Sequence, residues 1–281
     1  MTLFKTTKSL QAHMQKLKNK NLKIGFVPTM GALHAGHLAL MKECKKKCDV
    51  VVCSIFVNPT QFNDKKDFEK YPVTIENDIF LLETNKIDVL FLPSVNEIYD
   101  DGIENLQHFN LGYLENILEG KYRPGHFQGV CNVVSRLLKS VQPDIIFLGR
   151  KDYQQYLVLK KMMQDFYPAI DIEAAAIQRE KSGLAMSSRN MRLSDEAKTS
   201  AAFIYENLQQ LKKNIFSKGF EELKQNVADD LLKNGFQKID YIELCDAETL
   251  LPTTPDKSKK LIVLIAAFIE DVRLIDNLLL N

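Results

Sequence analysis

The stretch LKIGFVPTMGALHAGHLALMKECKKKCDVVVCSIFV, residues 22–57, decides the fold of this chain. Its mostly apolar start, Leu22–Val27, predicts a strand, and Pro28–Gly31 then indicates a tight turn. A helical pattern follows through Cys48, and the β-branched run Asp49–Val57 predicts a second strand. Strands that are almost continuously apolar are typical of a parallel sheet covered on both faces.

The same alternation of strand and helix continues to about residue 177. The further strands are expected at Asp88–Pro93, Asp144–Gly149 and Ile170–Ile177, and the helices at Thr74–Lys86, Gly129–Val141 and Tyr153–Phe166. This order predicts an α/β fold with a Rossmann-like doubly wound parallel sheet. Ligands of such sheets bind at the carboxyl ends of the strands.

The pattern changes after residue 177. Two helical segments, residues 194–215 and 220–235, precede three strand-like segments at 238–246, 261–269 and 272–280. Ser194 is a candidate N-cap, since acidic residues follow it in the first turn. We therefore expect two domains, residues 1–177 and a smaller α+β domain, residues 178–281, that closes over the active site.

Composition limits the classes of function. The 281 residues carry a net charge of +1, which gives no indication of a nucleic-acid partner. The longest apolar run, Leu261–Ile269, is about half of a membrane-spanning length, and the N-terminus is too polar for a signal peptide. The five cysteines lack the CxxC spacing of a metal site. The sequence predicts a cytoplasmic protein without membrane, nucleic-acid or protein-held metal binding.

Two histidines, His34 and His37, follow the first strand and open a helix. A helix N-terminus has unpaired N–H groups and a positive dipole end, and both favour phosphate. Gly31 and Gly36 let a ligand or the backbone approach closely. A zinc pair and a purely structural cap are the alternatives, and phosphate chemistry is favoured because no third metal ligand lies nearby in the sequence.

Four more polar segments lie near the ends of predicted elements. Ser54–Phe62 carries two neutral amides, which can donate and accept hydrogen bonds. Leu148–Gln155 places a lysine and an aspartate after a strand, and Gly183–Asn190 combines two hydroxyls with an arginine, which suits phosphate oxygens. Gly120–Val130 carries three basic side chains that could face phosphates or solvent; the sequence does not decide.

Together, PTMGALHAGH, SIFVNPTQF, GKYRPGHFQGV, GRKDYQQ and GLAMSSRN, in this order, resemble the pantoate–β-alanine ligase family. HxGH alone also occurs in other nucleotidyltransferases, but the ordered set is specific. The resemblance implies ATP-dependent condensation of pantoate with β-alanine to pantothenate, through pantoyl adenylate, with release of pyrophosphate and AMP. It also implies Mg²⁺ with the nucleotide and a homodimer.

The resemblance further implies roles for individual residues. The implied catalytic residues are His34, His37, Lys151, Ser187, Ser188 and Arg189, with His37 as the proton donor. The implied ATP-binding residues are Met30, Gly31, Ala32, Leu33, His34, Ala35, Gly36, His37, Gly149, Arg150, Lys151, Asp152, Gln178, Met186, Ser187, Ser188 and Arg189. The implied pantoate-binding residues are Gln61 and Gln155, with Gln61 also close to β-alanine.

This set suits the chemistry on physical grounds. A carboxylate nucleophile is already ionised at neutral pH, so the first step needs positioning and charge stabilisation rather than a general base. Three positions depart from the family pattern: Leu148 replaces an aromatic residue, Arg150 adds positive charge, and Gln178 stands where valine is common. The alternatives are an adenylate-forming nucleotidyltransferase with a different acid substrate, and a non-catalytic ATP-binding module.

Overall fold

The structure, a computed structural model, describes residues 1–281, and the chain forms two units. The first unit contains Met1–Arg150 and Gln155–Ala176, and the second contains Lys151–Gln154 and Ile177–Asn281. None of the helices combines the length and the apolar character that a membrane crossing requires.

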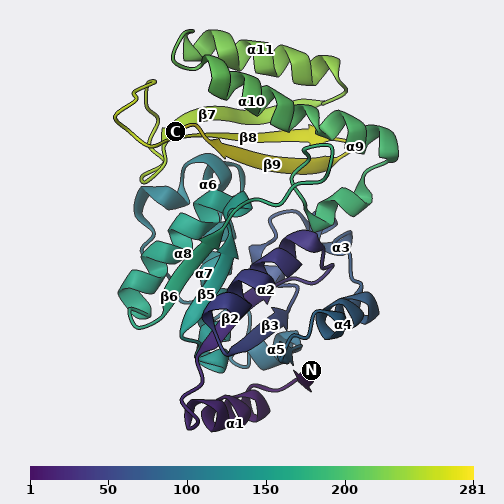
Figure 1. The fold of residues 1–281 in the computed structure, drawn as a ribbon, viewed down its shortest axis with the longest axis vertical. Helices are drawn as coiled ribbons and strands as arrows, with labels where there is room; N and C mark the ends of the chain where they lie inside the picture. Colours follow the sequence, from purple (N-terminus) through teal and green to yellow (C-terminus); the bar gives the residue numbers. More distant parts are fainter. The chain divides into compact units, whose positions relative to one another are not determined.

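Six parallel strands form the sheet of the first unit, in the order β1-β4-β3-β2-β5-β6. Figure 1 labels β3, β2, β5 and β6 of this sheet. They are β1 (Thr2–Phe4), β2 (Ile24–Thr29), β3 (Val50–Ile55), β4 (Val89–Phe91), β5 (Ile145–Gly149) and β6 (Asp171–Ala175). The predicted doubly wound parallel sheet is confirmed, and each of its five predicted strands is present. The edge strand β1 was not predicted because three residues are too few to show an alternating pattern.

Helices cover both faces of this sheet. They are α1 (Thr7–Lys18), α2 (Ala35–Lys47), α3 (Lys65–Glu69), α4 (Ile75–Thr84), α5 (Val95–Ile98), α6 (Leu118–Tyr122), α7 (His126–Val141) and α8 (Tyr153–Phe166). Residues of α2 and α4 share one buried cluster with Val27, Val51 and Phe147 of the strands. Because side chains alternate along a strand, Phe26 points to the opposite face, where α7 contacts β2. The predicted helices α2, α4, α7 and α8 are confirmed. The 12-residue helix α1 was not predicted, and α3, α5 and α6 have 5, 4 and 5 residues, too few for a periodic signal.

The first strand is longer than predicted. Pro28 was expected in a turn, but β2 continues to Thr29 and Pro28 pairs with Ser54 of β3. Proline lacks the N–H that a central strand normally donates. It is tolerated here because β5 pairs with β2 only at Gly25 and Phe26, so no hydrogen bond to β5 is lost at Pro28.

The second unit is an antiparallel three-stranded sheet covered by helices. It contains α9 (Asp195–Ala201), α10 (Phe203–Asn214), α11 (Phe220–Lys233), β7 (Lys238–Asp246), β8 (Leu261–Ile269) and β9 (Val272–Leu279). The strand order is β7-β8-β9, and α10 and α11 pack on the sheet (Figure 1). The predicted α+β architecture is confirmed. The prediction of a single helix over 194–215 is wrong. The segment divides into α9 and α10 at Ala202, whose N–H donates to the carbonyl of Thr199, three residues earlier, rather than four as in an α-helix.

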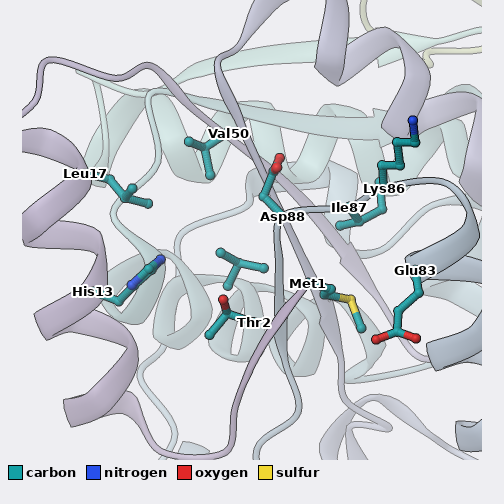
Figure 2. Close-up of a pocket in the computed structure, with 10 residues that line it drawn as sticks. Met1, Thr2, His13, Leu17, Val50, Glu83, Lys86, Ile87 and Asp88 are labelled. Atoms are coloured by element: carbon teal, nitrogen blue, oxygen red, sulfur yellow. The ribbon is translucent and has the colours of Figure 1, made fainter.

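The topology selects one edge of the parallel sheet for ligands. The chain passes from β2 through β3 to β4 on one side, and from β5 to β6 on the other. The strand order therefore reverses between β2 and β5, which is where open α/β sheets bind their ligands, at the carboxyl ends. A cavity of about 440 Å³ lies at the opposite edge, where Thr2, Val50 and Asp88 begin their strands or directly precede them (Figure 2). No candidate site residue lines that cavity.

Candidate active site

The two histidines form the start of α2 and cap it with their own rings. His34 is the N-cap, and its Nδ1 accepts the N–H of Gly36 at 3.1 Å. Nδ1 of His37 accepts the N–H of His34 at 3.3 Å, and the ring centroids are 4.1 Å apart. An imidazole nitrogen that accepts a hydrogen bond carries no proton, so the network assigns the proton to Nε2 in both rings. Each ring is therefore a neutral N–H donor.

Backbone N–H groups before and at the start of α2 are paired, whereas the sequence predicted that they would be unpaired. The carboxylate of Asp78, at the start of α4, accepts the N–H of Ala32 at 2.9 Å and that of Leu33 at 2.8 Å. The N–H groups of His34 and Gly36 are bonded to the imidazoles. The expectation of unpaired amides is thus wrong for these four residues, and the imidazole rings are the donors that this segment can direct to a ligand.

The same carboxylate explains the glycine in this loop. Gly31 has φ of +79° and Ala32 has φ of +47°, both in the left-handed region. A Cβ on Gly31 would approach Asp78 Oδ2 and Ile55 Cγ2 to 3.0 Å. Glycine is therefore required both by the backbone angle and by the close approach of the buried Asp78.

The amide of Gln61 is fixed by a buried asparagine at the end of β3. Asn58 is 1% exposed, and its Nδ2 donates to Gln61 Oε1 at 3.1 Å and to the carbonyl of Gly129 at 3.2 Å. Gln61 Nε2 in turn lies 3.0 Å from Met30 Sδ. The structure therefore brings together Gln61 and Met30, for which the family resemblance implies contacts with the acid substrate and with the nucleotide.

The basic segment 120–130 holds the backbone of Gln61. His126 Nδ1 is 2.8 Å from the carbonyl of Gln61, and Arg123 contacts His126 Nε2 at 3.2 Å. Because a guanidinium can only donate, His126 Nε2 accepts and Nδ1–H donates to Gln61. Arg123 also pairs with Glu119 at 3.7 Å. These two of the three basic side chains therefore form hydrogen bonds with the protein, an outcome that the sequence left open.

The end of β5 and the segment after it carry five more candidate residues. In the first unit, Gly149 ends β5, Arg150 is exposed, and Gln155 is half-buried near the start of α8. In the second unit, the carbonyl of Lys151 accepts the Nδ2 of Asn277 in β9 at 2.9 Å. Asp152 lies 3.9 Å from the Lys151 ammonium, so this lysine keeps a nearby counter-charge.

The loop Gly183–Asn190, which we call the serine loop, forms hydrogen bonds within itself and with the strand-like segment before it. Ser187 accepts the N–H of Arg189 at 3.3 Å, and Ser188 is buried. Asn190 Nδ2 donates to the carbonyl of Ala185 at 3.1 Å, and the carbonyl of Gln178 accepts the N–H of Met186 at 3.0 Å. The backbone of this loop is therefore fixed, including that of Gln178, whose side chain is exposed.

A buried ion pair holds the base of the same loop. Arg179 donates to both carboxylate oxygens of Asp276, at 2.6 and 2.9 Å, and to the carbonyl of Gly183 at 3.1 Å. The guanidinium lies 3.7 Å from the ring centre of Tyr205. Burial raises the pKa of Asp276, and the hydrogen bonds and charge of Arg179 oppose that rise. The pair is therefore satisfied only while both partners are present.

Sequence reasoning missed Asp78, Asn277 and the Arg179–Asp276 pair. None of these lies in a segment that resembles a motif, and each contacts residues at least 45 positions away in the chain. A single sequence carries no signal for such pairs, because nothing local distinguishes a buried carboxylate from an exposed one.

Comparisons with known proteins agree with this fold over its whole length. The family model described as pantoate-beta-alanine ligase matches residues 2–279. A pantothenate synthetase of Buchnera aphidicola subsp. Schizaphis graminum is 41% identical over 280 residues, covering 99% of this chain and 98% of that protein. The crystal structure of pantothenate synthetase from Thermus thermophilus is 36% identical, with a TM-score of 0.92 and coverage of 100% and 99%.

A second solved structure is the pantoate-beta-alanine ligase of Francisella tularensis, complexed with beta-gamma ATP and beta-alanine. It is 40% identical to this chain, with a TM-score of 0.85 and coverage of 100% of this chain and 98% of that one. The family model and these relatives match residues of both units. The chain belongs to the pantoate–β-alanine ligase family.

Proposed function

We propose that this enzyme joins pantoate to β-alanine with ATP, through an enzyme-bound pantoyl adenylate. The observation that carries the proposal is the arrangement of His34, His37, Met30 and Gln61 at the carboxyl edge of the parallel sheet. It combines N–H donors suited to phosphate with a positioned amide suited to a hydroxy acid. The ligands of the Francisella tularensis relative support the same pair of co-substrates.

In the first step, a pantoate carboxylate oxygen attacks the α-phosphorus of ATP, and the bond to pyrophosphate breaks. The carboxylate is ionised at neutral pH, so no protein base is needed. Gln61 and Gln155 bind the pantoate, and the Nε2–H groups of His34 and His37 donate to phosphoryl oxygens. These donors stabilise the charge that accumulates on the phosphate in the transition state.

Other residues of the proposed nucleotide site follow β2 and β5 or lie in the serine loop. Lys151, Ser187, Ser188 and Arg189 supply one cation, two hydroxyls and a guanidinium to the phosphates. The remaining contacts to ATP are proposed from Met30–Gly36, Gly149, Arg150, Asp152, Gln178 and Met186. Gln178 is proposed to contribute through its backbone, because it stands where the family commonly has valine, which has no polar side-chain group.

In the second step, the neutral amine of β-alanine attacks the acyl carbon of pantoyl adenylate, and AMP leaves as the C–O bond breaks. The attacking nitrogen loses a proton as the amide forms, and that proton passes to the departing phosphate of AMP. The donor role of His37 is proposed as a hydrogen bond from Nε2–H to a departing phosphate oxygen, because Nε2 carries the single proton of this neutral ring in the tautomer that the network assigns.

Magnesium is proposed to enter with ATP. No group of three or more His, Cys, Asp or Glu side chains lies close enough together to hold a metal ion. Mg²⁺ usually keeps several waters and binds through substrate phosphates, so a protein-built cage is not required.

We also propose that the enzyme works in the cytoplasm as a homodimer. The dimer follows from the family resemblance. The cysteines support the cytoplasmic location, because all five are free, as thiols are in a reducing compartment. Burial raises the pKa of Cys53, Cys131 and Cys245 to about 12, so these thiols stay protonated and unreactive. Analytical ultracentrifugation of the purified chain tests the dimer.

The test of the proposed activity is product formation. Purified enzyme with ATP, pantoate, β-alanine and Mg²⁺ should yield pantothenate and AMP in equal amounts. A panel of other hydroxy acids separates the alternatives: turnover with a different acid and none with pantoate would indicate another adenylate-forming enzyme. ATP binding without turnover of any acid would indicate a non-catalytic module.

A further inference from the structure

The side chain of Tyr99 is linked to the amide of Gln61, a proposed pantoate contact, through one intermediate residue, Asn58. Tyr99 follows α5, is 4% exposed, and donates its hydroxyl hydrogen to Asn58 Oδ1 at 2.7 Å. Two other groups contact that oxygen, Thr60 Oγ1 at 3.1 Å and the N–H of Thr60 at 3.4 Å. The tyrosine hydroxyl is therefore the closest donor to the carbonyl end of the Asn58 amide.

The other end of the same amide faces acceptors. Asn58 Nδ2 donates to the carbonyl of Gly129 and to Gln61 Oε1. An asparagine amide whose oxygen accepts from Tyr99 can present only N–H groups on its opposite side. Gln61 must then accept with Oε1, which leaves its Nε2 pointing away from Asn58, beside Met30 Sδ. A thioether is a weak acceptor, so a substrate oxygen can replace it at little cost.

The tyrosine ring is held in place from outside this network. The guanidinium of Arg136 lies 4.8 Å from the centre of the ring and donates to the carbonyl of Ile98 at 3.1 Å. Burial raises the pKa of Tyr99, so the hydroxyl stays protonated and keeps its role as donor.

We infer that Tyr99 is a positioning residue that, through Asn58, turns the Gln61 amide so that its N–H₂ group faces pantoate. The inference rests on the proposed function, because it names Gln61 as a pantoate contact. It implies that the site offers a hydrogen-bond donor at this point and selects a substrate oxygen over a substrate N–H group. Tyr99 itself contacts no substrate in this scheme.

The test is steady-state kinetics of Tyr99→Phe, which keeps the ring and its contact with Arg136. We expect the KM for pantoate to rise by roughly 3- to 10-fold, the scale of one lost hydrogen bond, with the KM for ATP unchanged. Tyr167→Phe is the matched control, since it removes a hydroxyl bonded to Ser135 at 2.7 Å in the same unit. It should alter neither constant. Thr60→Val removes the longer contact to Asn58 and should give a smaller rise.

A double-mutant cycle separates positioning from a general structural effect. In the Gln61→Ala background, Tyr99→Phe should leave the KM for pantoate unchanged, because the group that it orients is gone. An equal rise in both backgrounds, or no rise in the single variant of an active enzyme, would overturn the inference alone. An inactive wild-type enzyme would overturn the proposed function and this inference together. A thermal melt of each variant shows that it is folded.

Discussion

The two units hold their candidate site residues by different means. In the parallel-sheet unit, the residues lie in the loops after strand ends. They are fixed by the carboxylate of Asp78, which comes from α4, and by the amide of Asn58, which lies in the same loop as Gln61. In the antiparallel unit, Lys151 and the serine loop are fixed by side chains of the last strand, Asn277 and Asp276. The first arrangement depends on the sheet topology, and the second depends on one buried ion pair and one amide.

The difference predicts different responses to substitution. A strand end keeps its place as long as the sheet is folded, so changes at the first unit's site should affect ligand binding or rate more than stability. The loop of the second unit has no such support, so breaking its ion pair should cost stability first. Substitutions in the two units, taken from the largest expected effect to the smallest, test that contrast.

The largest effect is expected from Arg179→Met. The variant leaves the buried carboxylate of Asp276 without its partner, which should lower the free energy of unfolding by about 3–5 kcal/mol at neutral pH. Chemical denaturation measures this value. The double variant Arg179→Met, Asp276→Leu should recover most of the loss, because an apolar pair needs no compensation. A single variant as stable as wild type would show that the pair does not hold this loop.

The next effect is on rate. His37→Ala removes an Nε2–H donor from the first unit and should lower kcat by about 10²-fold or more. It also removes the acceptor of the His34 N–H, so we expect a loss of only about 1 kcal/mol in the free energy of unfolding. His108→Ala, an exposed histidine in the same unit, is the control and should keep full activity. If both variants retain wild-type kcat, the histidine pair has only a structural capping role.

Asp78→Asn tests the carboxylate that holds the loop before α2. The two carboxylate oxygens of Asp78 accept the N–H groups of Ala32 and Leu33, whereas an asparagine side chain has one oxygen and one N–H₂ group. One of these two backbone N–H groups therefore loses its acceptor. We expect a rise in the KM for ATP and a loss of about 1–3 kcal/mol in the free energy of unfolding. Glu76→Gln, an exposed change on the same helix, is the control. A KM for ATP that stays at the wild-type value would separate this loop from nucleotide binding.

The smallest effect concerns the start of α9 in the second unit. Ser194 caps the helix by accepting the N–H of Ala197, and its own N–H and hydroxyl donate to Glu270. Ser194→Ala should cost about 1 kcal/mol at neutral pH. The bonds from Ser194 hold the pKa of Glu270 below its ordinary value of 4.5, so their contribution is present above that value and is lost as the pH falls through the lowered pKa.

The stability difference between wild type and Ser194→Ala should therefore narrow on acidification below about pH 4.5, where Glu270 becomes protonated in the unfolded and then the folded state. Denaturation at a series of pH values measures the difference. A gap that widens in acid would contradict the assigned hydrogen bonds.

Much of the fold could be predicted because its signals are local. The β-branched run at 50–55 and the apolar run at 261–269 are strands in the structure, and the amphipathic segment Tyr153–Phe166 is the helix α8. The break at Ala202 could not be predicted, since the residues on both sides favour a helix. The extension of β2 through Pro28 depends on where β5 stops pairing, which is a property of the neighbouring strand.

The candidate site divides in the same way. His34, Gln61 and Lys151 lie in the loops that follow predicted strands, so their position along the chain was enough to select them. The proton positions on His34 and His37 depend on which N–H group meets which ring nitrogen, and Asp78 reaches the loop from a helix 45 residues further on. Those features come from tertiary contacts that no single stretch of sequence specifies.

The most direct test of the proposed chemistry is ATP–pyrophosphate exchange in the absence of β-alanine. If the enzyme forms pantoyl adenylate and pyrophosphate reversibly, labelled pyrophosphate should enter ATP when pantoate is present and should not when pantoate is omitted. The His37→Ala variant should show exchange slowed by about 10²-fold or more. Formation of pantothenate without any pantoate-dependent exchange would contradict the adenylate route.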